Sequence, residues 1–211
     1  MKNVAVGLRV HSGWSALVAL SLEEGEPVVL GRERLQLVET FNYSFRQPYH
    51  TAAKGSLEEG REFISKVKAE ATRLALRAFR AVQRKLEETD YRLTHCGLLV
   101  ASARPLPDLE TILSAHPLIH TAEGMLFREA VSAAGRKYGL KELQVKEKGL
   151  LEQASDALGR DEDALLRRVT ELGHPLGSPW SQDEKFASLA AWLALSEKRE
   201  GVAAAKKGAR A

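Results

Sequence analysis

The sequence lacks the residues that mark several common functional classes. It has one cysteine, Cys96, so the chain cannot form an internal disulfide bond. It contains no paired-cysteine motif, no Gly-rich phosphate loop and no serine nucleophile elbow. No apolar run is long enough to span a bilayer, and the N-terminus leads directly into a predicted strand rather than a secretory signal. A cytoplasmic location is therefore predicted. Cys96 lies beside an apolar run, which predicts a buried, inert thiol.

The chain also lacks a large excess of charge of either sign, because its formal net charge is only +3 over 211 residues. This balance permits a nucleic-acid partner without requiring one. With 44% hydrophobic residues, the chain can bury one full core, and we predict a single domain over residues 1–200. Residues 201–211 (GVAAAKKGARA) have no large apolar side chain and are predicted to be a basic, disordered tail.

The most informative stretch present is residues 4–22, VAVGLRVHSGWSALVALSL. Apolar side chains at every second position predict a strand, and Ser12-Gly13 predicts a tight turn into a second strand. Both faces of the second strand are largely apolar, so helices are expected on both faces of the sheet. A third strand over residues 28–38 has a charged middle, which is typical of a sheet edge.

A long helix is predicted from Ser56, its N-cap, to about Thr89, because apolar residues recur at helical spacing. One face of this helix carries Arg73, Arg77, Arg80 and Arg84. Two interpretations stay open for this arginine face. It is either a solvated surface with acidic neighbours at residues 59, 62 and 70, or a surface that contacts nucleic-acid phosphates.

The remaining elements alternate between strands and helices. Strands are predicted at residues 95–101 and 141–147, and the first of these follows a long helix, which favours parallel pairing with the first strand. Helices are predicted at residues 108–115, 122–138, 150–158 and 162–172, and a last helix begins after its cap, Ser181. Residues 39–55 and 116–124 are expected to be irregular.

This order of elements resembles the ribonuclease H-like fold. The segment GLRVHSGWSALVAL is also similar to the opening hairpin of crossover-junction resolvases, in Gly7 to Val10 and in Gly13-Trp14. The resemblance implies an α/β protein with a mixed sheet, in which three antiparallel strands are followed by two parallel strands, flanked by helices. Nucleases of this fold hold two divalent metal ions with carboxylates on the first strand, the fourth strand and the last helix.

The sequence departs from that pattern of carboxylates. The predicted first and fourth strands contain no Asp or Glu, and only the last helix offers acids, Asp183 and Glu184. One filled ligand position of three would not hold two magnesium ions. We therefore expect the standard nuclease chemistry to be absent, and we predict no cofactor.

Another chemistry could use residues near the same strand ends. His11 lies at the end of the first strand and Arg104 just after the fourth, and loops carry His50, His116, His120 and Glu123. The last three offer nitrogen and oxygen donors that suit zinc. Separately hydrogen-bonded loop histidines are the alternative, because Pro117 argues against a continuous helix through His116, so that the imidazoles need not face each other.

Three hypotheses follow. The first, which we favour, is a catalytically degenerate ribonuclease H-like domain that binds nucleic acid or a protein partner. The second is a hydrolase-type enzyme with a changed His/Glu site for a divalent metal or a small ligand. The third is a structural subunit of a homo-oligomer, for example a homodimer formed through the exposed third strand. No membrane partner is expected.

Overall fold

The structure is a computed structural model that describes residues 1–40, 42–101 and 105–196. Five strands form one sheet in the order β3-β2-β1-β4-β5. β1 (Lys2–His11), β2 (Trp14–Glu23) and β3 (Glu26–Gln36) are antiparallel, whereas β4 (Tyr91–Val100) and β5 (Lys141–Lys146) continue the sheet parallel to β1. The predicted hairpin, the edge position of the third strand and the parallel pairing of the fourth are confirmed.

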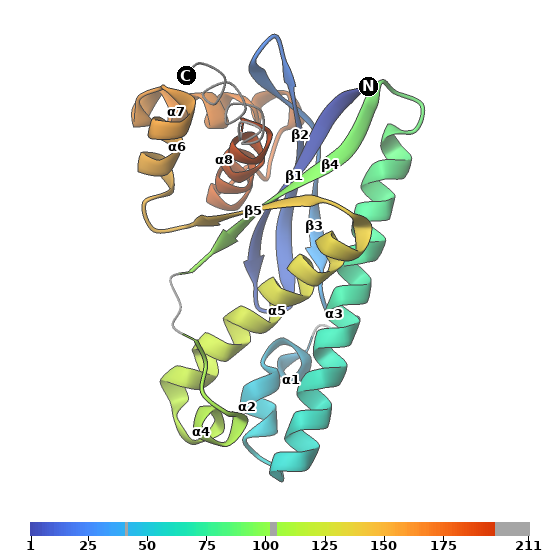
Figure 1. Cartoon of the computed structure of the whole chain (residues 1–211), viewed down its shortest axis with the longest axis vertical. Coiled ribbons are helices and arrows are strands. Elements are labelled where there is room, and N and C mark those ends of the chain that lie inside the picture. The colour runs from blue at the N-terminus through green and yellow to red at the C-terminus, as the bar shows by residue number, and fades with distance from the viewer. Residues whose placement is uncertain (41, 102–104, 197–211) are drawn as a thin grey trace, which may run out of the picture.

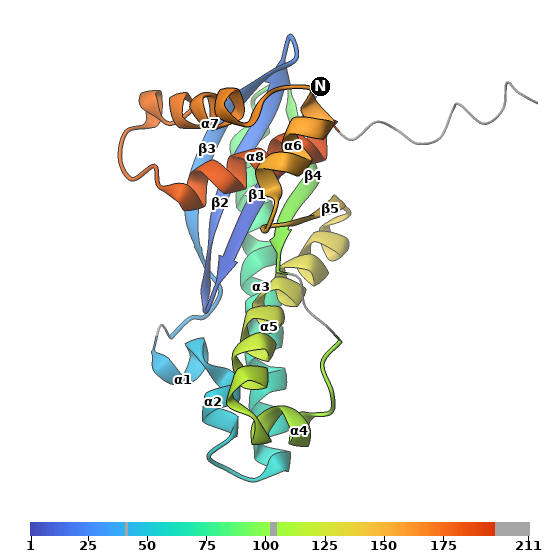
Figure 2. The same ribbon diagram turned by 90° about the vertical axis from the view of Figure 1, so that its left-hand side faces the viewer.

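Helices cover both faces of this sheet (Figure 1). The helices are α1 (Tyr43–Arg46), α2 (Pro48–Ala52), α3 (Leu57–Leu86), α4 (Leu109–Ser114), α5 (His116–Tyr138), α6 (Leu150–Leu158), α7 (Glu162–Glu171), the 3-10 turn η1 (His174–Leu176) and α8 (Gln182–Ser196). α3 and α5 lie on one face, and α6, α7 and α8 lie on the other (Figure 2). No helix in the described ranges is both long enough and apolar enough to cross a membrane.

The alternation of side chains along β1 builds the two cores. Val4, Val6 and Leu8 pack into the core beneath α3 and α5, and Ala5 packs into the core beneath α6, α7 and α8. Arg9 shares the parity of Ala5, so its side chain emerges on the α8 face. Cys96 is fully buried in the first of these cores, as predicted.

Two paired glycines allow α8 to lie directly on the middle of the sheet. Gly7 of β1 and Gly97 of β4 are neighbours in the parallel register. A Cβ at Gly7 would lie 1.7 Å from the carbonyl oxygen of Ala187, and one at Gly97 would lie 2.1 Å from that of Ala190. Only glycine leaves room for the α8 backbone here, and this contact brings the start of α8 close to the end of β1.

A group of helices, which we call the helical extension, lies beyond one end of the sheet (Figures 1 and 2). It consists of α1, α2, α4 and the adjoining ends of α3 and α5. The prediction that residues 39–55 form an irregular loop is wrong, because this segment contains α1 and α2. The Asn42 side chain accepts a hydrogen bond from the Phe45 N–H and caps α1, and Pro48 occupies the first turn of α2, where no helical donor is needed.

The prediction that residues 116–124 are irregular is also wrong. α5 begins at His116, and Pro117 lies in its first turn. A proline there costs no helical hydrogen bond, so it starts the helix instead of interrupting it. The predicted end of this helix at Gly139 is confirmed, since Gly139 adopts φ 88° as its left-handed C-cap.

Most other helix and strand boundaries lie close to those predicted from the sequence. α3 begins at the predicted N-cap, where Ser56 and Glu59 form a reciprocal capping box. β4 starts at Tyr91, four residues before its predicted start at His95. Two predictions lie outside the described residues: the disordered tail over residues 201–211 and the position of Arg104.

Candidate functional site

Four charged or titratable side chains meet where β1 ends beside the start of α8. The Arg9 Nη1 donates a hydrogen bond to the Asp183 Oδ1 at 2.6 Å, and its Nε donates to the Glu147 Oε1 at 3.2 Å. The Arg9 Nη2 also donates to that Glu147 oxygen. The His11 Nε2 lies 2.8 Å from the same Asp183 oxygen. We call Arg9, His11, Glu147 and Asp183 the arginine cleft.

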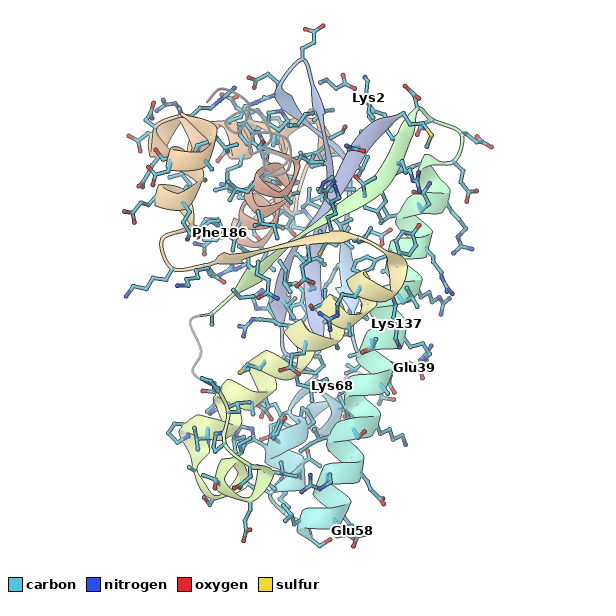
Figure 3. All side chains as sticks on the ribbon, in the orientation of Figure 1. Lys2, Glu39, Glu58, Lys68, Lys137 and Phe186 are labelled. Carbon is cyan, nitrogen blue, oxygen red and sulfur yellow. The ribbon has the colours of Figure 1, made fainter. Side chains whose placement is uncertain are left out.

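Local structure explains why these side chains converge. Ser181 accepts a hydrogen bond from the Asp183 N–H, which places Asp183 in the first turn of α8. Glu147 directly follows β5, the parallel neighbour of β4. The Phe186 ring, labelled on the α8 side of the sheet in Figure 3, lies 5.4 Å from the Arg9 guanidinium. An aromatic ring thus lies over the guanidinium.

The two carboxylates stabilise the charge of Arg9 in this largely buried position. Burial by itself would lower the pKa of Arg9, but the hydrogen bonds to Glu147 and Asp183 raise it above its usual value. On the other side of Asp183, the His11 ring stacks on Trp14 with 4.3 Å between ring centroids. The predicted candidate His11 is therefore held between a carboxylate and an indole.

These residues do not fit the two-metal centre of the fold's nucleases. A guanidinium lies between the two carboxylates that could ligate an ion, and its positive charge opposes a divalent cation. Glu184, the other predicted acid, accepts hydrogen bonds from the backbone N–H and the hydroxyl of Ser181 and caps the helix. The cleft therefore offers a salt-bridge network instead of an open set of oxygen ligands.

A second cluster lies in the helical extension and contains three of the predicted candidates. His50 of α2 and His116 and His120 of α5 each offer a ring nitrogen, and these atoms all lie within 4.8 Å of one another. The Nε2 atoms of His50 and His116 are 3.3 Å apart. The expectation that the imidazoles of His116 and His120 need not face each other is wrong, because they lie one turn apart on α5 with ring centroids 4.4 Å apart.

Glu123 belongs to the same cluster, but it lies beneath the histidines. Its side chain is only 3% exposed. Its Oε1 accepts hydrogen bonds from the His50 ring Nδ1 at 2.9 Å and from the His50 backbone N–H at 3.2 Å. Glu123 is therefore a carboxylate that orients His50, and it is not a third donor beside His116 and His120 as the sequence suggested. His11 makes its contacts in the arginine cleft instead.

The third candidate surface is a groove of about 590 Å³ between α3 and the end of α5. It is lined by Arg73, Arg77, Arg80, Arg84, Leu76, Gln83, Glu87 and Tyr138. All four arginines are exposed, as the helical spacing predicted. Arg73 forms an ion pair with Glu39, a residue labelled in Figure 3. We call the four arginines the arginine groove.

The arginine groove keeps most of its positive charge uncompensated. In the described part of the chain, Arg77, Arg80 and Arg84 form no ion pair with a carboxylate, although Glu87 lies at one end of the groove. Two of the acidic neighbours named in the sequence analysis bond elsewhere: Glu59 caps α3, and Glu70 accepts a hydrogen bond from the Glu39 backbone. Tyr138 lines the groove beside the arginines, and burial is the main cause that raises its pKa.

Two members of the arginine cleft, Arg9 and Glu147, were missed from the sequence. Arg9 could have been found, because it has the same strand parity as His11 and must emerge on the same face of the sheet. Glu147 gives no such signal. Its partner is 138 residues away in sequence, and only the sheet order brings the two together.

No protein-family model matches the chain, and no curated protein matches it. Among solved structures, it is similar to Thermus thermophilus RuvC in complex with a Holliday junction substrate. That match has a TM-score of 0.53 at 13% identity and covers 94% of this chain and 96% of that chain. A second T. thermophilus RuvC structure has a TM-score of 0.48 at 11% identity, with 90% and 92% covered. The first likeness shows the fold, so the predicted ribonuclease H-like architecture is confirmed.

Proposed function

We propose that this ribonuclease H-like chain is a nucleic-acid-binding module without the fold's two-metal nuclease chemistry. The arginine groove is the surface assigned to the phosphates. The observation that carries the proposal is the uncompensated charge of Arg77, Arg80 and Arg84 on one exposed helix face. Such charge attracts phosphates through the release of condensed counterions.

The dimensions of the groove suit a nucleic-acid backbone. Arg73 and Arg84 are eleven residues apart on α3, which corresponds to about 16 Å along a helix. Base pairs of a duplex rise about 3.4 Å each, so the row of arginines matches about five base-pair steps. Arginine donors are also well suited to phosphate oxygens because their planar fork can make two parallel hydrogen bonds.

The arginine cleft supports the non-catalytic part of the proposal. A metal-assisted hydrolysis needs carboxylate oxygens that are free to hold cations, and Asp183 and Glu147 are both bonded to Arg9. The likeness to RuvC supports the choice of ligand, since that protein was solved with a Holliday junction substrate. Branched DNA is therefore the first ligand to test, together with a linear duplex and a single strand.

Binding is tested by fluorescence anisotropy of labelled DNA at a series of salt concentrations between 50 and 200 mM. We expect the double variant Arg77→Gln, Arg80→Gln to bind more weakly and to lower the slope of log K against log salt by about 1.8, since each lost phosphate contact contributes about 0.9. The matched control is Arg61→Gln, Lys66→Gln, which removes two exposed charges from the same helix outside the groove. This control should keep the wild-type slope.

Two outcomes would overturn the proposal. If both double variants lose affinity equally, the binding reflects net charge and not the groove. If the wild-type chain cleaves the bound DNA with Mg²⁺ or Mn²⁺ and Asp183→Asn abolishes cleavage, the chain is a nuclease despite its cleft.

A further inference from the structure

The geometry points to a zinc-binding site formed by His50, His116 and His120, in a part of the molecule that the proposed function does not use. We call these three residues the histidine cluster. They come from two helices that are separate in sequence, α2 and the first two turns of α5.

The distances between ring nitrogens suit a tetrahedral ion. Zinc binds imidazole nitrogen at about 2.0–2.1 Å, so two nitrogens on one tetrahedron lie about 3.3 Å apart. The His50 and His116 Nε2 atoms are already at 3.3 Å. The third nitrogen, from His120, completes a set within 4.8 Å, and its exposed side chain can close the remaining distance by rotating.

The buried carboxylate of Glu123 prepares His50 for this role. Because the carboxylate accepts a hydrogen bond from the His50 Nδ1, the proton resides on Nδ1 and the lone pair is on Nε2. A histidine whose second nitrogen donates to a carboxylate is the usual arrangement around protein-bound zinc. In the absence of an ion, the His50 Nε2 accepts a hydrogen bond from the His116 Nε2. An ion would replace that proton as the shared partner of both rings.

Three imidazole ligands favour zinc over hard cations such as Mg²⁺ and Ca²⁺, which prefer oxygen. They also leave a fourth coordination position for water or a small ligand. The ion would tie α2 to α5 within the helical extension. Because binding would occur only in the folded chain, zinc should raise the melting temperature.

The first experiment measures thermal unfolding of the chelator-treated full chain with and without Zn²⁺. At zinc a hundredfold above the dissociation constant, we expect Tm to rise by about 5–10 °C for a chain of this size. Calorimetric titration should give one ion per chain. Co²⁺ should give the visible absorption of a tetrahedral nitrogen site.

Matched variants separate this site from general metal binding. His120→Ala removes an exposed ligand and should abolish the Tm rise and the Co²⁺ absorption, whereas His174→Ala, which removes an exposed histidine outside the cluster, should change neither. Glu123→Gln should weaken zinc about 10–100-fold in the titration, because Glu123 orients His50. The titration reports affinity even if this variant lowers Tm.

The proposal is overturned if Zn²⁺ leaves the wild-type Tm unchanged. It is equally overturned if His120→Ala and His174→Ala lose the same amount of binding. Those results would leave the three histidines as a hydrogen-bonded group that only packs α2 against α5.

Discussion

Replacing Arg9 by methionine tests whether its guanidinium takes the place of a metal ion in the arginine cleft. Methionine keeps much of the length and apolar volume of arginine, but it removes the positive charge and the donors to Asp183 and Glu147. Asp183 then keeps His11 as its hydrogen-bonding partner, and Glu147 keeps the nearby charge of Arg128, but neither replaces the two-sided contact of the guanidinium. We expect the folded state to lose stability at neutral pH.

The loss can be bracketed from the exposure of the three side chains. Removing one partner of a fully buried ion pair costs about 3–5 kcal/mol, and breaking an exposed pair costs less than about 1 kcal/mol. Arg9, Asp183 and Glu147 are 18%, 22% and 38% exposed, so they lie between these limits. We therefore expect a loss of about 2 kcal/mol, which corresponds to a Tm decrease of about 4–8 °C.

The assay is thermal unfolding with and without 10 mM Mg²⁺, with Arg73→Met as the matched control. Arg73 forms an exposed ion pair, so its replacement should cost less than about 1 kcal/mol. If the freed carboxylates bind Mg²⁺ with a dissociation constant of about 1 mM, the Arg9 variant regains about 1.4 kcal/mol and the wild-type chain regains none. An Arg9→Met variant as stable as the wild type would refute this account of the cleft.

Two further predictions concern the core. Gly7→Ala should lower the free energy of unfolding by about 1–3 kcal/mol or more in a denaturant titration, because the added methyl group meets the Ala187 carbonyl. The control Gly31→Ala on β3 has open space around the added methyl group and should cost nothing. Equal effects of the two substitutions would show that α8 does not rest on Gly7. Burial raises the pKa of Cys96, so a thiol reagent at pH 8 should label it only as the chain unfolds, and rapid labelling of the native protein would contradict its buried position.

The sheet could be predicted from the sequence because its signals are local. Alternating apolar residues and the Ser12-Gly13 turn specify the β1–β2 hairpin, and the register pairs His11 with Trp14 across that turn. A charged strand such as β3 cannot be buried on both sides, so its edge position also follows from its composition. The positions of the four groove arginines could also be predicted from a local signal, because the helical period alone places them on one face of α3.

The histidine cluster could be predicted only in part. The sequence offered His116, His120 and Glu123 as donors, but the predicted helix start at residue 122 is six residues too late, and α2 was predicted to be a loop. The error came from interpreting Pro117 as a helix breaker, although proline is well accommodated in a first turn. The contact between α2 and α5 is tertiary, and no local pattern shows that His50 would meet the other two rings.

The surface proposed for nucleic-acid binding is also separate from the place where nucleases of this fold act. The arginine groove is built on α3, which covers one face of the sheet, whereas the residues of the arginine cleft lie beside α8, which covers the other face (Figures 1 and 2). In the arginine cleft, the Arg9 guanidinium is already paired with both Asp183 and Glu147, so it is not a free cation for phosphate. We therefore expect nucleic acid held by the groove to lie on the α3 side of the molecule, away from Asp183, so that Asp183→Asn should not weaken binding.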